Sequence, residues 1–227
     1  MIISNTHRAI FVHVPKTAGT SMTALIDPHL GWNDLVLGGT EFGERLNLAY
    51  RERFGLNKHM WARDIRRVVG ADLWSRYFTF AFVRHPYARL ASFYRWTEGR
   101  AACAAPDSPF WTWPATKAFL GTSSFSEFLR DSRFVEARSG RPQADWVCDE
   151  DGRCIVDFVG RFEALEDGVR TVAARLGIEG SDLERRNPSP ASGSSADLFR
   201  DEADYDWIHR IHRQDFELFG YDPSLRL

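Results

Sequence analysis

An apolar run that ends in a short glycine loop, residues 10–21, constrains the fold of this chain more than any other segment. The run is rich in β-branched residues and breaks at Pro15, which predicts a strand, a tight loop and a helix that begins near Ser21. The first amides of a helix lack intrahelical partners, and the helix dipole favours negative charge there. The segment therefore predicts a site for a phosphate or a sulfate ester, at which Gly19 admits the anion to the backbone and Lys16 adds a positive charge.

The loop differs from the nucleotide-hydrolysing P-loop, in which the lysine directly follows the last glycine. Here Lys16 comes three residues before Gly19. The sequence His-Val-Pro-Lys-Thr-Ala-Gly-Thr-Ser resembles instead the 5′-phosphosulfate loop of sulfotransferases that use 3′-phosphoadenosine 5′-phosphosulfate (PAPS). It has the form found in the carbohydrate branch, sulfotransferase family 2. The resemblance implies that one continuous segment binds the 5′ end of PAPS, namely Lys16, Thr17, Ala18, Gly19, Thr20 and Ser21.

A second segment joins a buried strand to a phosphate-binding pattern. Residues 77–83 are nearly all apolar, which is typical of a strand buried on both faces of a parallel sheet. Arg84 follows at the carboxyl end of this strand, where ligands bind in open α/β sheets, and Pro86 suits the first turn of a helix. The pattern Arg-x-Pro-x-x-Arg-x-x-Ser resembles the 3′-phosphate site of sulfotransferases. It implies that Arg84 and Ser92 bind the 3′-phosphate, a task that suits the planar fork of arginine.

The resemblance continues toward the C-terminus and covers about residues 8–222, most weakly over 96–142. The segment around Phe162 resembles the late strand of the family and the helix that follows it, which implies that Phe162 lies near the adenine. Arg186, in a polar loop, is also expected to bind the cosubstrate. No cysteine and histidine spacing is that of a zinc site. We expect no metal, because Lys16 and the helix end supply the positive field.

The general base is expected among the seven histidines, because imidazole titrates near neutral pH. His59 resembles the position at which this branch carries its catalytic histidine, which implies that it is the base. The alternatives are the nearby carboxylate Asp64 and His13 on the first strand, which can also be read as a packed core residue. His59 can also be read as a surface histidine with no role. By the same resemblance, Lys16 is the second catalytic residue and acts on the leaving phosphate.

Alternating strands and helices predict an α/β fold, a single domain over residues 1–227 with a central parallel sheet flanked by helices. The expected elements are strands at 8–14, 77–83 and 160–163, a hairpin at 143–158, and helices at 20–27, 41–54, 62–69, 86–97, from 124 onward, 165–176 and 197–218. Residues 98–123 are expected to be irregular and to form an acceptor-side loop. The aromatic residues Phe110, Trp111 and Trp113 in this loop either face a sugar ring or cover the core.

Composition excludes some classes of protein. A chain of 227 residues with 44% hydrophobic residues can bury a full core. A net charge of −2 gives no reason to expect nucleic acid or an acidic membrane as partner. No run approaches the roughly 20 apolar residues of a membrane-spanning helix, and no leader pattern precedes the first strand. We expect a soluble enzyme of the bacterial cytoplasm, although an anchor trimmed from the sequence would leave the same pattern.

Cys148 and Cys154 flank an Asp-Gly turn, across which they would face each other. Oxidation would be feasible there, but a reducing cytosol argues against a structural disulfide.

Taken together, the resemblance implies transfer of a sulfuryl group from PAPS to a hydroxyl, with release of 3′-phosphoadenosine 5′-phosphate (PAP). A carbohydrate hydroxyl is the favoured acceptor. The alternatives are a small phenol or alcohol as acceptor, a nucleotide-binding module without catalysis, and a P-loop kinase. A kinase would need carboxylates that bind magnesium.

Overall fold

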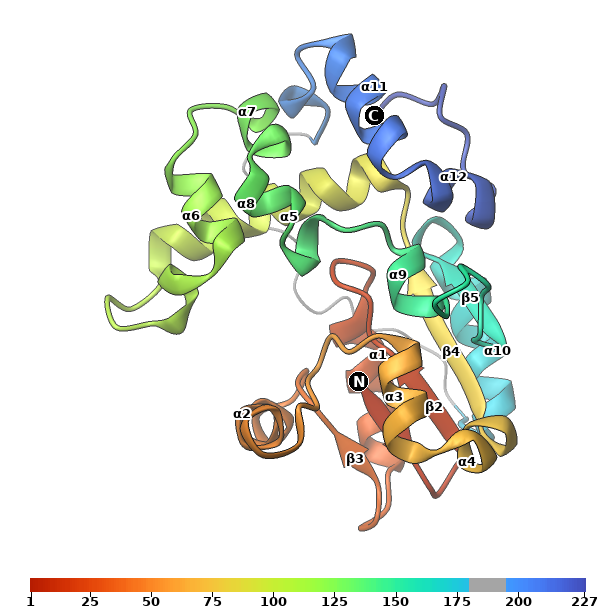
Figure 1. Cartoon of the computed structure of the whole chain (residues 1–227). Coiled ribbons are helices and arrows are strands. Elements are labelled where there is room, and N and C mark those ends of the chain that lie inside the picture. The colour runs from red at the N-terminus through yellow and green to blue at the C-terminus, as the bar shows by residue number, and fades with distance from the viewer. Residues whose placement is uncertain (180–194) are drawn as a thin grey trace. The chain divides into compact units, whose positions relative to one another are not determined.

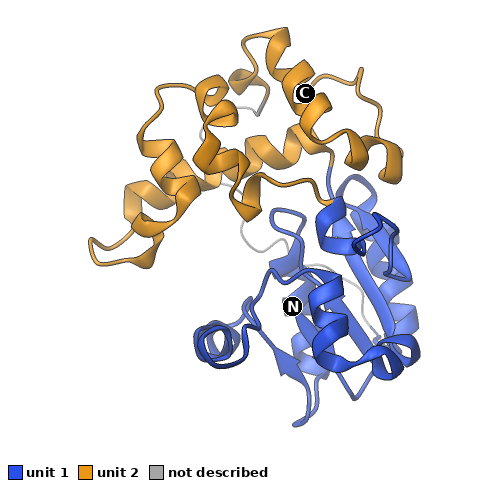
Figure 2. Cartoon of the chain, viewed as in Figure 1, with its two compact units in different colours: residues 1–84, 144–187 blue, residues 85–143, 188–227 orange. Residues whose placement is uncertain are grey.

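The structure is a computed structural model, which describes residues 1–179 and 195–227. The chain divides into two compact units, shown in Figure 2. Unit 1 comprises Met1–Arg84 and Ala144–Asn187, and unit 2 comprises His85–Gln143 and Pro188–Leu227. A single domain over the whole chain therefore stays a prediction.

Unit 1 contains a five-stranded sheet, which confirms the α/β class (Figure 1). Its strands are β1 (Ile2–Ser4), β2 (Ala9–Val12), β3 (Leu35–Val36), β4 (Phe78–Val83) and β5 (Phe158–Arg161). The strand order is β3-β1-β2-β4-β5. Strands β2, β4 and β5 run parallel, as expected, whereas β1 is antiparallel to both β2 and β3. The sheet is therefore mixed, because the chain begins with a hairpin that the sequence pattern did not reveal.

The helices of unit 1 mostly follow the sequence prediction. They are α1 (Gly19–Ile26), α2 (Glu41–Phe54), α3 (Ala62–Val69), α4 (Ala71–Arg76), α9 (Ala144–Val147) and α10 (Leu165–Leu176), with the short 3-10 turns η1 (Asp27–His29) and η4 (Phe162–Ala164). Local signals explain their bounds. The Thr40 side chain caps α2 by accepting a hydrogen bond from Gly43, and Gly177 ends α10 in the left-handed region at φ 67°.

A hydrophobic core lies between the sheet of unit 1 and two of its helices. Phe11 of β2 and the residues Phe80 and Phe82 of β4 pack in one buried cluster with side chains of α1 and α10, such as Met22 and Val169. Burial of this apolar face fixes β2 and β4 next to each other, so their carboxyl ends share one edge of the sheet.

Unit 2 is helical. Its helices are α5 (Pro86–Cys103), α6 (Pro114–Leu120), α7 (Phe125–Arg130), α8 (Ser132–Val135), α11 (Glu202–Ile211) and α12 (Arg213–Phe219), with the 3-10 turns η2 (Pro109–Thr112), η3 (Arg138–Gly140) and η5 (Ser195–Leu198). Helix α7 begins where the sequence predicts a helix, and Ser124 caps it, since its hydroxyl accepts a hydrogen bond from the Glu127 amide at 3.2 Å.

Several predicted elements are corrected by the structure. Residues 98–123 are not irregular, because α5 continues to Cys103 and η2 and α6 follow. The alanine-rich stretch after residue 100 has high helix propensity, which outweighs its lack of an apolar stripe. The expected last helix is two helices that meet at His212, and the expected hairpin shrinks to one isolated bridge between Cys148 and Cys154, both of them reduced.

Arg89, the second arginine of the phosphate-binding pattern, holds the interior of unit 2 together. Its side chain is fully buried, and its guanidinium donates to the carbonyl oxygens of Ser139 at 3.1 Å and Arg141 at 2.8 Å. Burial lowers the pKa of Arg89 to about 10, and the nearby carboxylate of Asp215 acts in the opposite direction. These contacts give Arg89 a structural role.

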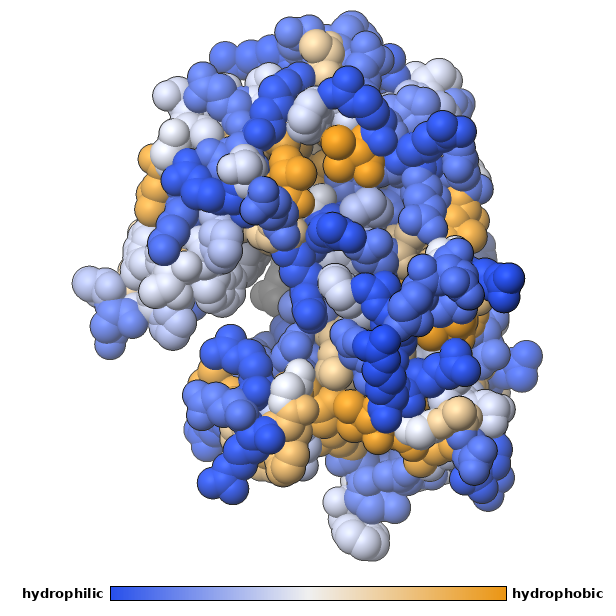
Figure 3. All heavy atoms as spheres, viewed as in Figure 1, coloured by the Kyte–Doolittle hydropathy of each residue, from blue (hydrophilic) through white to orange (hydrophobic). Residues whose placement is uncertain are grey.

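Some large apolar side chains are exposed among the residues that the structure describes. Charged and polar residues cover most of the face seen in Figure 3, with hydrophobic residues in separate patches. Trp32 and Phe42 are examples of exposed apolar residues in unit 1. Among the helices that the structure describes, we find none with the length and apolar character that crossing a membrane requires.

Candidate active site

Three segments of unit 1 meet at the carboxyl edge of the parallel strands (Figure 1). The loop with Lys16 follows β2, Arg84 follows β4, and Phe162 follows β5. The register pairs Val12 with Ala81 and Val83 with Arg161, so these strands end at the same edge. Ligands bind at this edge in open α/β sheets, which makes it the candidate site.

The loop between β2 and α1 has a strained backbone. Lys16 and Ala18 adopt φ angles of 69° and 65°, which lie in the left-handed region that few residues other than glycine adopt. Thr17 lies buried between them and donates its hydroxyl to the Val14 carbonyl at 2.9 Å. The N-cap residue of α1 is Ala18, whose side chain forms no capping hydrogen bond. A loop of this kind at a helix N-terminus forms a concave backbone site for an anion.

Gly19 is the first residue of α1, and it touches the ring of His13. A Cβ atom on Gly19 would lie 1.9 Å from Nε2 of His13, so no other residue fits there without a rearrangement. His13 is only 3% exposed and stacks on Phe11 with 5.4 Å between ring centroids. The imidazole of His13 therefore supports the loop from beneath, a second reason for glycine at this position.

Positive charges gather around the loop. The pKa of Lys16 falls to about 8, first because the side chain is largely buried and then because Arg84 and Lys58 are close. The guanidinium of Arg84 lies over the ring of Phe162, with its central carbon 4.3 Å from the ring centroid. Lys16 and Arg84 thus repel each other at one edge of the sheet, and Lys58, which is paired with Glu44, adds to the positive charge around Lys16. A bound anion would relieve this repulsion, so the electrostatics favour a ligand with several negative charges.

His59 lies between α2 and α3, and a backbone hydrogen bond orients its imidazole. Nδ1 of His59 lies 2.8 Å from the carbonyl oxygen of His13, and the two rings meet edge to face at 4.7 Å between centroids. A carbonyl only accepts, so Nδ1 carries the hydrogen and Nε2 keeps the lone pair of a base. The indole of Trp146 also donates to the His59 carbonyl at 3.2 Å.

The pKa of His59 falls to about 3, because its ring is largely buried and because Lys58 is close. The imidazole is therefore neutral at physiological pH. The two other residues considered as base are differently placed. Asp64 pairs with Arg67 at 3.1 Å on the surface of α3. His13 is only 3% exposed, whereas His59 is partly exposed and is therefore the more accessible of the two imidazoles. His59 is the best placed of the three to act as a base.

The structure brings together only part of the predicted set. Lys16, Gly19, Arg84, Phe162 and His59 are all in unit 1. Ser92 belongs to unit 2, where it is buried in α5, and Arg186 lies outside the described residues. Within the described ranges, we find no group of three or more His, Cys, Asp or Glu residues arranged to hold a metal ion.

Sequence reasoning missed Lys58, whose charge lowers the pKa of both Lys16 and His59. Its position next to His59 in the sequence was the only available signal. Glu44 was missed as well. It pairs with Lys58 at 2.8 Å, but it is 14 residues away in the sequence and has no motif of its own.

No curated protein and no solved structure gave a match. The profile of the sulfotransferase family (family 2) matches residues 1–222, which is almost the whole chain. The match includes both the loop after β2 and the segment that follows β4. The chain therefore belongs to the sulfotransferase family, whose members are transferases of a sulfuryl group.

Proposed function

We propose that this sulfotransferase moves the sulfuryl group of PAPS to an acceptor hydroxyl and releases PAP. One observation carries the proposal: His13 contacts both the anion-binding loop and the proposed base, His59. Its ring supports Gly19 in the anion-binding loop, and its carbonyl oxygen orients His59. A base of fixed tautomer beside an anion-binding loop is what transfer from an anionic donor to a hydroxyl requires.

The reaction exchanges one S–O bond for another. The acceptor oxygen forms a bond to sulfur, and the bond between sulfur and the 5′-phosphate oxygen breaks, with its electron pair passing to that oxygen. Nε2 of His59 takes the proton of the acceptor hydroxyl. Lys16 and the amides at the start of α1 stabilise the charge on the leaving phosphate. By analogy with phosphoryl transfer, catalysis comes mainly from positioning and electrostatics.

The 3′-phosphate is proposed to bind Arg84 and Ser92, with the adenine near Phe162 and with Arg186 as a further ligand. The contact of Arg84 with Phe162 supports this, because it holds the guanidinium beside the aromatic ring.

The proposal predicts which nucleotide stabilises the protein. PAP should raise the melting temperature more than ATP with magnesium does, whereas a P-loop kinase would show the reverse order.

Arg84→Ala and Ser92→Ala should each lower the affinity for PAP by about tenfold to a hundredfold, since a charge-assisted hydrogen bond contributes roughly 1.5–3 kcal/mol. Adenosine 5′-phosphosulfate, which lacks the 3′-phosphate, should be affected much less. Equal weakening of both ligands would mean that these residues only support the fold.

Lys16→Met should lower the turnover rate by about 10²–10³, because it removes the charge that stabilises the leaving phosphate. The pKa of about 8 adds a pH dependence. Above pH 8 the free protein carries a neutral Lys16, so binding must take up a proton, and PAP affinity should fall as the pH rises. Isothermal titration calorimetry between pH 6 and 9.5 measures this slope. Lys117→Met, on the surface of α6, is the matched control and should keep the wild-type slope. A steep slope that persists in Lys16→Met would contradict the assignment.

His59→Ala should lower kcat by about 10²–10⁴ and leave the affinity for PAP within about twofold. In the wild type, kcat/KM should show no acid limb from His59 near pH 6.5, because the pKa of about 3 keeps the free imidazole neutral there. His29→Ala, an exposed histidine of the same unit, should behave like the wild type. A fully active His59→Ala protein would move the role of base to Asp64 or His13.

The acceptor is proposed to be a carbohydrate hydroxyl. The support is the form of the phosphosulfate loop, since the aromatic residues of unit 2 give little. Phe110 is 2% exposed and belongs to the interior, and the Trp111 indole donates to the Ala105 carbonyl at 2.8 Å. Trp113, which is 41% exposed, stacks on Trp96. We expect labelled PAPS to sulfate oligosaccharides in a panel that also holds phenols and alkyl alcohols. Transfer to phenols or alcohols alone would overturn the carbohydrate assignment.

A further inference from the structure

Helix α2 is attached to unit 1 in an unusual way. Of its fourteen residues, all of which the structure describes, only Gly43 is buried. A Cβ atom on Gly43 would lie 2.9 Å from the Gly38 carbonyl oxygen, so the helix approaches this neighbouring segment backbone to backbone. The Gly38 amide also donates to the Gly43 carbonyl at 2.8 Å. Because most helices are held by an apolar face, the polar contacts of α2 call for an explanation.

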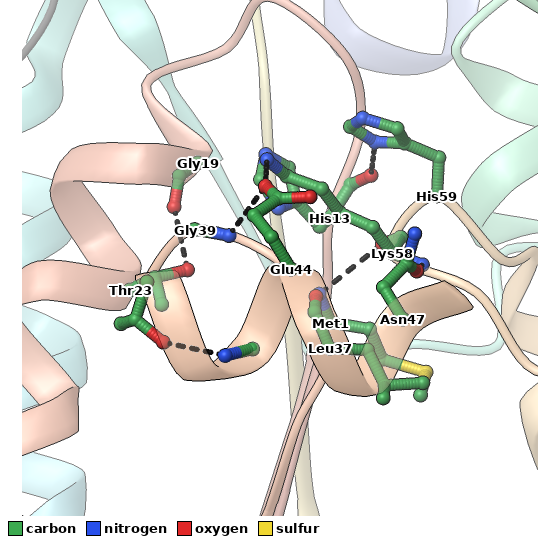
Figure 4. A network of polar contacts seen from close by, with 12 residues as sticks. Met1, His13, Gly19, Thr23, Leu37, Gly39, Glu44, Asn47, Lys58 and His59 are labelled. Atoms are coloured by element: carbon green, nitrogen blue, oxygen red, sulfur yellow. Dashed lines mark hydrogen bonds and ion pairs between the residues drawn. The ribbon is translucent and has the colours of Figure 1, made fainter. Parts of the chain in front are cut away.

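Two side chains of α2 reach the residue that precedes His59 (Figure 4). The Glu44 carboxylate accepts from the Lys58 ammonium at 2.8 Å and, with the same oxygen, from the Gly39 amide at 2.9 Å. One turn further along α2, Oδ1 of Asn47 accepts from the backbone amide of Lys58 at 2.6 Å. Lys58 is thus held by its main chain and by its charged end.

The rest of the Lys58 side chain is also confined. Its carbon chain passes beneath Gly38, where a Cβ atom would lie 2.3 Å from Cδ of Lys58. The next residue, His59, receives its own contacts. Its amide donates to Oδ1 of Asn57 at 3.1 Å, and Nδ1 donates to the His13 carbonyl at 2.8 Å. The contacts of α2 therefore end at Lys58, the residue directly before the one that carries the imidazole.

We infer that Glu44 and Asn47 are positioning residues for His59, and that they act through Lys58 to hold the imidazole against the His13 carbonyl. Neither residue touches the reacting atoms. The inference rests on the proposed function, in which His59 is the base, and adds the element that orients it. Helix α2 therefore supports, through these polar contacts, the segment that carries Lys58 and His59.

The same contacts fix the charges that His59 experiences. Lys58 and the N-terminal amino group disfavour its protonation, whereas the hydrogen bond to the His13 carbonyl and the Glu44 carboxylate favour it. The His13 ring meets it edge to face. Glu44 therefore has two effects, since it holds Lys58 near His59 and partly offsets the positive charge there. Lys58→Met removes that charge, and the pKa of His59 should rise.

Nitrogen-15 NMR of the histidine rings tests the inference without any need for activity. In the wild type, His59 should show the tautomer with hydrogen on Nδ1 and should not titrate between pH 5 and 8. Glu44→Gln and Asn47→Ala should give signals averaged between the two tautomers, because the ring loses its fixed orientation. Asn47→Asp keeps the accepting oxygen and should restore the wild-type tautomer. In Lys58→Met the midpoint of the His59 titration should move to higher pH.

Kinetics supply the second measurement. Glu44→Gln and Asn47→Ala should lower kcat by about tenfold to a hundredfold at unchanged PAP affinity. Glu52→Gln removes the same charge from an exposed position on the same helix and should change neither kcat nor the NMR signals. Unaltered His59 tautomer and titration in Glu44→Gln and Asn47→Ala would overturn the inference, even if activity fell. If the NMR results hold but the wild type transfers no sulfuryl group, the positioning role stands and the proposed function fails.

Discussion

The contact between His13 and Gly19 is the constraint on which the candidate site depends. His13 continues the line of β2 past its last paired residue, and its ring fills the space beneath the first residue of α1. Its carbonyl oxygen, which lies outside the ladder of the sheet, accepts from Nδ1 of His59. One residue therefore sets the distance between the sheet, the anion-binding loop and the base. Burial of its ring on Phe11 ties this arrangement to the hydrophobic core.

Electrostatics around the loop oppose the protonated forms of both proposed catalytic residues in the free protein. The pKa of Lys16 is lowered to about 8 and that of His59 to about 3, in each case first by burial and then by neighbouring charge. A donor with several negative charges, bound at Lys16 and Arg84, offsets the effect of the neighbouring positive charges on these pKa values. In the proposed complex His59 therefore becomes a stronger base once the donor is bound. Proton removal from the acceptor is then favoured only when a sulfuryl group is present to receive it.

Local signals made much of the fold predictable. Local residues determine the strands β2 and β4 and the end of α10 at Gly177. The structure has these three features near the positions that the sequence predicts. The β1–β2 hairpin was missed, because β1 has only the three residues Ile2–Ser4, too few to show a periodicity. The break at His212 was missed for a different reason, since the contacts around Asp215 come from residues far away in the chain. The roles of Glu44 and Asn47 were missed for the same reason, because both residues contact Lys58, which is distant from them in the sequence.

The loop after β2 combines strain with unfavourable charge in the free protein. Two residues other than glycine with left-handed backbone conformations cost of order 1–3 kcal/mol each, and the lowered pKa of Lys16 adds an electrostatic cost. The surroundings hold this conformation through the core of β2 and β4 and through the Thr17 hydrogen bond to Val14. An anion would gain contact with amides already directed by this backbone, without a further cost of ordering. The rigid core and the strained loop therefore belong together, because the core maintains the loop in the shape that its ligand requires.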